Sequence, residues 1–210
     1  LNNWNNIKEK LTFVKGIFFE DIAVYMTTKN IPLIWNTSHA VISTNSINYW
    51  LSLVDSACLS NELTKEEIIN IINNVNKEIV LPIYGKNMAM YSRRSLISNY
   101  QKHKGITLND HNLTPDNKIT FKEVENSYGT VFFADTPFNY INVLKDINDA
   151  KIKLYYFDLA GITPEEMFEI LNGKEVSCDN RFLEHKTIYK LEAKKWLNYY
   201  HLQVTKKKCV

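Results

Sequence analysis

A chain of 210 residues with 45% hydrophobic and 12% aromatic residues suits one domain with a sizeable core. Its formal net charge of +2 is too small to indicate a nucleic-acid or membrane partner, and no apolar run approaches the roughly 20 residues that cross a bilayer. The three cysteines, Cys58, Cys178 and Cys209, are too far apart for a zinc motif or a disulfide framework, which favours a reducing, cytoplasmic setting.

The first half of the chain alternates short apolar runs with amphipathic segments. Strands are predicted where branched and aromatic residues cluster, at 16–19, 31–35, 56–60 and 79–84. Helices are predicted at 22–29, at 45–54 and from Thr64 onward, where Thr64 and Glu67 form a capping box. Gly85 is expected to end the last strand by allowing a sharp exit. This alternation predicts a parallel sheet or barrel with helices outside.

The alternation is interrupted after Tyr100 and resumes later. The polar stretch 101–118 predicts a loop, and the runs 119–124 and 130–133 predict an inserted β-hairpin. Thr136-Pro137 then predicts a helix start. The buried face of that helix would contain Phe138, Ile141, Leu144 and Ile147.

A strand at 153–159 and a helix opened by Thr163-Pro164 and ended by Gly173 complete the pattern. We therefore expect a domain over residues 1–173. The remaining residues, 174–210, predict a basic C-terminal extension, either a nucleic-acid arm or a solvated terminus.

Polar side chains follow several of the predicted strands, at the ends where chemistry collects in strand-then-helix proteins. The candidates for acid–base or metal chemistry are Asp21, His39, Glu62 and Asp158. His39 also fits a hydrogen-bonded structural histidine, and Asp21 and Glu62 also fit helix-entry charges. Asp158 interrupts a strongly apolar run, which favours a functional role.

A second group, Tyr91, Ser92, Arg93 and Arg94, follows the fourth predicted strand. Two fixed positive charges and a phenol suit a substrate carboxylate, carbonyl or phosphate. The alternative is a solvated arginine pair beside tyrosines at the rim of the core. In the functional interpretation, this group borders the same pocket as the strand-end residues.

The sequence contains no phosphate loop, dinucleotide fingerprint, zinc-protease motif, serine elbow or cysteine-nucleophile motif. Cys58 lies within an apolar strand, which favours a buried structural thiol.

Five short segments, in this order, resemble motifs of peptidase family U32, the collagenase-like proteases. They are Asp21-Ile22-Ala23-Val24, Asn61-Glu62-Leu63-Thr64, Tyr84-Gly85, Tyr91-Ser92 with Arg93 or Arg94, Leu96, Ser98 and Tyr100, and Tyr128-Gly129-Thr130-Val131-Phe132. The resemblance runs from Gly16 to Gly173, and the order and spacing of the motifs make it specific. Departures include Asn36-Thr37-Ser38-His39 in place of the family's Ser-Thr-Gln, and Tyr84 in place of its histidine.

The resemblance implies a barrel-like, TIM-type α/β domain and a peptide-bond hydrolase of unassigned mechanism, acting on a peptide or protein. Some relatives take part in hydroxylating transfer or ribosomal RNA, so an RNA-binding protein is the alternative, and a non-catalytic binding module is the third. No metal site is assigned.

Relatives that hold an iron–sulfur cluster carry four cysteines near the Tyr-Ser motif, and residues 86–112 contain none, so no cluster is expected. The family's first strands are not found before Leu1, and the chain lacks an initiating methionine. We therefore expect a truncated member whose barrel is incomplete and has an open edge.

Overall fold

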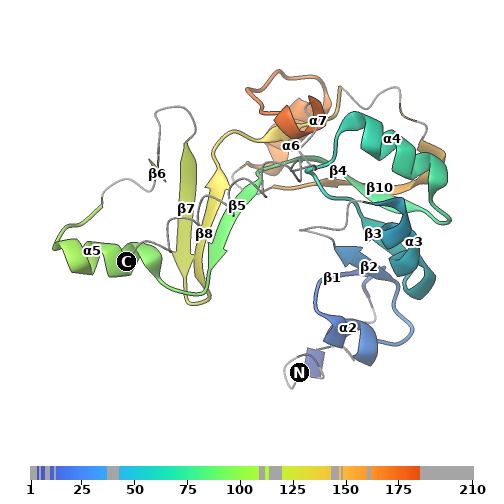
Figure 1. Ribbon diagram of the computed structural model, residues 1–210, viewed down its shortest axis with the longest axis horizontal. Helices are drawn as coiled ribbons and strands as arrows, with labels where there is room; N and C mark the ends of the chain where they lie inside the picture. The colour runs from blue at the N-terminus through green and yellow to red at the C-terminus, as the bar shows by residue number, and fades with distance from the viewer. Residues whose placement is uncertain are drawn as a thin grey trace, which may run out of the picture.

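The computed structural model describes residues 4, 6–7, 10–11, 13–36, 43–108, 112–113, 120–142, 147, 149–159 and 162–184. The fold is mixed α/β, with a helix-covered parallel sheet joined to a smaller antiparallel sheet (Figure 1). Within these ranges, each helix falls short of the length and hydrophobicity that a membrane crossing requires.

The larger sheet has five parallel strands in the order β1-β2-β3-β4-β10. They are β1 (Ile17–Phe19), β2 (Leu33–Asn36), β3 (Ser56–Cys58), β4 (Ile79–Gly85) and β10 (Ile152–Phe157). Each lies within two residues of a predicted strand at either end. All seven residues of β4 are buried, as expected for a central strand of a parallel sheet.

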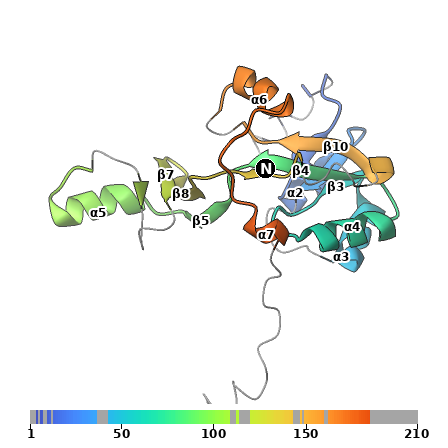
Figure 2. The same ribbon diagram turned by 90° about the horizontal axis from the view of Figure 1, so that it is seen from above.

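Three helices pack beside the larger sheet: α2 (Ile22–Thr27), α3 (Thr44–Leu53) and α4 (Lys65–Asn74). Figure 2 shows α3 and α4 on one side of the β4 and β10 strands and α6 on the other. Burying a large apolar side chain in this layer contributes about 1.5–3 kcal/mol. The buried residues include Ile47, Leu51, Ile68, Ile71, Ile72, Ala57, Ile79 and Leu81. The predicted capping box of Thr64 and Glu67 is confirmed at the start of α4.

The larger sheet is strongly curved. Phe18 of β1 and Tyr156 of β10 have ring centroids 5.8 Å apart, although their strands are the two edges of the five-stranded order. In a flat sheet these edges would be roughly 19 Å apart. The rings meet because the sheet curls around the face that they share, which also buries Ile34, Cys58 and Val80. Closure of this sheet into a barrel stays a prediction.

From the end of β4 the chain passes through Lys86 and Asn87 into the smaller sheet (Figure 1). Its antiparallel strands, in spatial order, are β5 (Met88–Ser92), β8 (Gly129–Ala134), β7 (Phe121–Asn126) and β6 (Asn112–Leu113). β7 and β8 confirm the predicted hairpin, with Ser127 and Tyr128 between the paired residues Asn126 and Gly129.

Helix α5 (Leu96–Lys104) lies at the far end of the smaller sheet (Figure 1). The predicted loop from 101 is therefore wrong for Gln101–Lys104, which complete this helix before Gly105 ends it with φ +66°. The reason is tertiary: the Glu125 carboxylate of β7 accepts hydrogen bonds from the N–H groups of Ile97 and Ser98 and so caps a polar helix.

The predicted helix after Thr136-Pro137 is also wrong. Residues Phe138–Asn139 form β9, antiparallel to the end of β4. Phe138 and Tyr140 are both buried, and the N–H of Tyr140 donates to the Ile83 carbonyl at 2.8 Å. Buried side chains two residues apart follow the strand period, whereas the apolar spacing further along the sequence imitates a helix. Leu144, assigned to the predicted buried face, lies outside the described residues.

The chain returns to the larger sheet with β10, which follows a short helical turn, η1 (Asp149–Lys151). Helix α6 (Pro164–Leu171) begins at the predicted cap, Thr163. Helix α7 (Arg181–Glu184) buries Leu183 in the main core, and the Asn180 side chain forms two hydrogen bonds with the backbone of Asn139. Residues 179–184 thus contact the domain, and residues 185–210 of the predicted extension lie outside the described residues.

Candidate functional site

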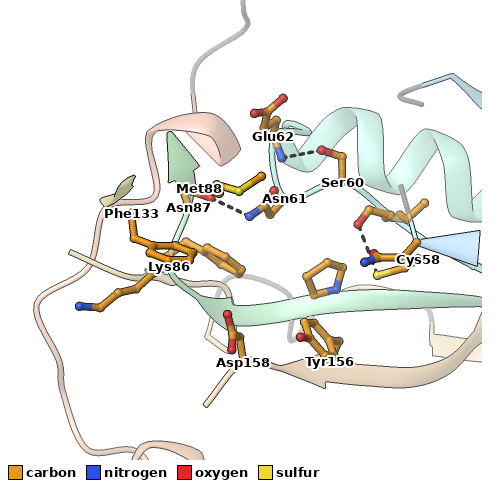
Figure 3. Close-up of a pocket in the computed structure, with 14 residues that line it drawn as sticks. Cys58, Ser60, Asn61, Glu62, Lys86, Asn87, Met88, Phe133, Tyr156 and Asp158 are labelled. Atoms are coloured by element: carbon orange, nitrogen blue, oxygen red, sulfur yellow. Dashed lines mark hydrogen bonds between the residues drawn. The ribbon is translucent and has the colours of Figure 1, made fainter. Parts of the chain in front are cut away.

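A pocket of about 190 Å³ lies at the carboxyl ends of β2, β3, β4 and β10 (Figure 3). These ends form one edge of a parallel sheet, so side chains from distant parts of the sequence meet there. Met88 of β5 and Phe133 of β8 border it from the smaller sheet. Its polar lining residues are Asn36, Ser60, Asn61, Glu62, Lys86, Asn87 and Asp158.

One side of the pocket is built by the close approach of Asp158 to Gly85. The Asp158 N–H donates to the Tyr84 carbonyl at 2.9 Å, which continues the pairing of β10 with β4. A Cβ atom on Gly85 would lie 2.9 Å from the Cβ of Asp158 and 3.3 Å from the Phe138 ring. Gly85 ends β4 as predicted, but its φ is not positive, so the sharp exit given as the reason for glycine is wrong. Glycine is required at this position because the Cβ of Asp158 lies too close for another side chain.

The opposite side is the loop after β3, which is fixed at Asn61. The Asn61 side chain donates to Oδ1 of Asn87 at 2.7 Å, and the backbone carbonyl oxygen of Asn61 accepts from the Tyr140 hydroxyl at 2.8 Å. Tyr140 is 1% exposed, and desolvation by burial raises the pKa of its phenol, so the hydroxyl stays a donor at neutral pH. These contacts hold the loop in one arrangement, which preorganises the pocket.

The pocket has charges of both signs. Figure 3 shows Asp158 pointing into it and Glu62 at its rim with the carboxylate turned outward. The Lys86 ammonium lies 3.2 Å from the Asp135 carboxylate, outside the centre of the pocket. Burial raises the pKa of the Cys58 thiol to about 12, so this residue stays neutral and is not an activated nucleophile.

This arrangement places hydrogen-bonding groups near flat apolar surfaces. The amides of Asn61 and Asn87 each offer a donor and an acceptor, and Asp158 adds acceptors. The rings of Phe133 and Tyr156 lie in the same lining. A cavity of about 150 Å³ is known to hold a benzene ring. The pocket therefore has room for one planar six-membered ring with polar substituents.

The structure brings two of the four predicted acid–base candidates to the pocket, Glu62 and Asp158. Asp21 is instead the N-cap of α2, where its carboxylate accepts a hydrogen bond from the Ala23 N–H at 2.8 Å. This is the helix-entry role that the sequence offered as its structural interpretation. His39 lies outside the described residues.

The arginine group is not part of this pocket. Tyr91 and Ser92 end β5, and Arg93 and Arg94 follow them as exposed residues at the far end of the smaller sheet. These side chains were predicted to border the strand-end pocket because they follow the fourth predicted strand. They lie elsewhere because Lys86 and Asn87 lead directly into a further strand, which carries the chain away from the larger sheet.

Sequence reasoning missed the amides and the lysine of the pocket. Asn61 and Asn87 pair across it, and Lys86 stands between β4 and β5. Each follows the end of a predicted strand by only a few residues, which is the signal that could have found them. Asparagine is common in turns for other reasons, so this position alone did not mark them.

Within the described ranges, no group of three or more His, Cys, Asp or Glu side chains is placed to hold a metal ion. The expectation that the chain binds no iron–sulfur cluster stays a prediction from its cysteine positions.

Comparison with known proteins places these features in a family context. The sequence model of peptidase family U32 matches residues 6–160, a range that includes every described strand of both sheets. Among curated proteins, the chain is similar to the tRNA hydroxylation protein P2 of Bacillus subtilis (strain 168), with 26% identity over 200 residues. The alignment covers 88% of this chain and 64% of that relative, so the chain spans less than two thirds of its length. No solved structure matches this chain.

Proposed function

This chain belongs to peptidase family U32, and we propose that it binds RNA for base hydroxylation, with the strand-end pocket holding one nucleobase. The observation that carries the proposal is the pairing of amide and carboxylate groups with aromatic rings around a cavity of about 190 Å³. The relative named tRNA hydroxylation protein P2 supports tRNA as the substrate class. A tRNA substrate also fits a cytoplasmic protein.

The base enters the pocket after leaving its stack, because its ring atoms are not accessible within a helix. Asn61, Asn87 and Asp158 contact its polar edge, and Phe133 or Tyr156 stacks on its face. A single-ring pyrimidine suits a cavity of this size better than a two-ring purine. These residues supply binding and orientation of the base.

The test is the binding of fluorescein-labelled tRNA, measured by anisotropy at one fixed salt concentration. Asn87→Ala and Asp158→Asn each remove groups that contact the base edge, so each should weaken binding by about 5–150-fold, since a base-edge contact is worth roughly 1–3 kcal/mol. Glu66→Gln is the matched control, because it changes a carboxylate to an amide on the exposed side of α4. Unchanged affinity in both pocket variants, with their folds intact by circular dichroism, would contradict the proposal.

Peptide-bond hydrolysis is the second candidate, because the carboxylates of Glu62 and Asp158 line the same pocket. A carboxylate can accept a proton from water as it attacks a peptide carbonyl. Cleavage of fluorogenic peptides and gelatin, with and without a chelator, tests this function. Turnover that disappears in both Glu62→Gln and Asp158→Asn would support it. A folded chain that binds tRNA and cleaves neither substrate would rule it out.

We also propose that the curved sheet is part of a TIM-type barrel. Five parallel strands with helices outside, and the contact of Phe18 with Tyr156 across the curved face, support this architecture. An experimental structure with further strands paired to β1 and β10 would agree with it. A structure in which both edges are covered by helices or loops would contradict it.

A further inference from the structure

The far end of the smaller sheet carries an exposed basic and aromatic surface, here called the distal patch: Tyr91, Arg93, Arg94 and Tyr128. Tyr91 is 50% exposed and Tyr128 is 80% exposed, and both arginines are exposed. In the described part of the chain, neither guanidinium forms an ion pair. Large exposed aromatic rings beside free arginines are unusual for a surface that contacts only water.

The backbone that carries the two arginines is firmly fixed. The Tyr91 hydroxyl donates to the Tyr128 carbonyl at 3.0 Å, which joins β5 to the hairpin turn. The Thr130 hydroxyl accepts from the Leu96 N–H at 2.9 Å and lies 2.8 Å from the Arg94 carbonyl oxygen. The loop between β5 and α5 is therefore held from the neighbouring hairpin on both sides of the arginine pair.

The hairpin turn also approaches this loop too closely for any side chain at Gly129. A Cβ atom there would lie 2.9 Å from the Cα of Arg93 and would overlap the Ser92 carbonyl, and Gly129 has φ +134°. Glycine thus allows the turn of the hairpin to pack directly on the backbone that bears the arginines. The fold therefore fixes the backbone of Arg93 and Arg94, although both residues are exposed and neither is part of the core.

The charge around the patch is positive. No Asp or Glu occurs between Glu78 and Asp110, a stretch that includes both arginines and α5. The Glu125 carboxylate of the adjoining hairpin accepts hydrogen bonds from the Ser98 side chain and from two N–H groups at the start of α5. Its charge is therefore engaged in capping the helix and is not placed as a partner for the arginines.

From these observations we infer that the distal patch binds the phosphate backbone and unpaired bases of the RNA whose base occupies the pocket. This inference rests on the proposed function. Arginine recognises phosphate through two parallel donors, and exposed tyrosines stack on bases without regard to sequence. β5 connects the two sites: Met88 lines the pocket and Tyr91 begins the patch, about 10 Å further along the strand. A few nucleotides of single-stranded RNA span that distance.

The experiment measures binding of fluorescein-labelled tRNA to the full chain across 50–300 mM KCl, a range over which the Debye length falls from above about 10 Å to below about 8 Å. The variant Arg93→Ala/Arg94→Ala should weaken binding at least ten-fold at low salt and lower the slope of log K against log salt by about 1.4, the value for two phosphate contacts on a single strand. Lys151→Ala/Lys153→Ala is the matched control, because it removes two exposed positive charges at the amino end of β10. It should leave affinity and slope near the wild-type values.

Three further variants keep the inference open to refutation if the alanine pair fails to fold. Arg93→Lys/Arg94→Lys retains the charge and should keep most of the salt slope, and Tyr128→Phe should bind as the wild type whereas Tyr128→Ala binds more weakly. Suppose that the wild type binds tRNA, and that the arginine variant loses no affinity or only as much as the control variant. The patch then has no role in binding, although the proposed function stands. If the wild type shows no salt-dependent tRNA binding, the proposed function and this inference fail together. Equal competition by polyglutamate would identify an acidic peptide as the partner and overturn the inference.

Discussion

Replacing Gly85 by alanine should destabilise the protein and disturb the pocket, because a Cβ atom there would lie 2.9 Å from the Cβ of Asp158 and 3.3 Å from the Phe138 ring. Both neighbours are held by strand pairing, β10 with β4 and β9 with β4. Overpacking of this kind costs typically about 1–3 kcal/mol, and the lower entropy of an unfolded chain with alanine offsets about 0.4–1 kcal/mol. The expected net loss is about 1–2 kcal/mol.

Gly16→Ala is the matched control for this substitution. Its Cβ would meet the Pro32 carbonyl at 3.4 Å, an ordinary contact, and its φ is not positive. This variant should therefore be as stable as the wild type or slightly more stable. The free energy of unfolding comes from urea titration followed by circular dichroism.

The same pair of variants also tests the pocket. Gly85→Ala should push Asp158 away from Asn61 and Asn87 and weaken tRNA binding several-fold, whereas Gly16→Ala should not. If both alanine variants unfold at the same urea concentration as the wild type and bind equally, the close approach at Gly85 does not seat Asp158, and the reasoning from it is wrong.

Three further predictions follow from the described contacts. Glu125→Gln should destabilise the protein by about 1 kcal/mol at pH 7, since it weakens the cap of α5. Desolvation opposes the shift, but hydrogen bonds from Ser98 and Thr130 hold the pKa of Glu125 below its usual value. Its stabilisation is therefore present above the unfolded pKa and is lost as the pH falls through the folded pKa. The urea midpoints of wild type and variant should converge as the pH is lowered through that range; a constant difference would contradict this. Tyr140→Phe should cost about 1–3 kcal/mol, because it leaves the carbonyl of Asn61 without its hydroxyl donor, and an unchanged urea midpoint would show that this bond is dispensable. In the folded protein at pH 8, iodoacetamide should modify the exposed Cys178 and not Cys58, whose pKa burial raises to about 12; labelling of both thiols at equal rates, by mass spectrometry, would argue against a buried Cys58.

The local signals of the sequence located most of the secondary structure. The strands of the larger sheet are short runs of buried branched residues, and the helix start at Thr64 is marked by its own capping box. These features depend on neighbours within a few residues, so a single sequence contains them. The hairpin after residue 119 was also predictable, because two apolar runs flank a turn sequence.

Features that depend on distant contacts were not predictable. The polar helix α5 continues to Lys104 because Glu125, from another strand, caps its start. The segment at Phe138 pairs with the end of β4 and so becomes a strand, although Thr136-Pro137 is a favourable helix start. Local propensity cannot reveal either partner.

The candidate site divides in the same way. That Glu62 and Asp158 line one pocket was predictable, because strand ends mark one edge of a parallel sheet. The arginine pair was expected beside them, but the structure places it at the far end of a second sheet, since nothing local shows that β5 follows β4 after only two residues. Asn61 and Asn87 were missed because their importance lies in pairing with each other across 26 positions of sequence.

The most direct measurement is ultraviolet cross-linking of tRNA to the full chain, with the modified peptides identified by mass spectrometry. If the strand-end pocket holds a base, cross-links should appear at its aromatic lining, Phe133 and Tyr156, and should decrease in Asp158→Asn. Bound tRNA that cross-links only to peptides outside the pocket, in amounts that Asp158→Asn does not change, would contradict the account.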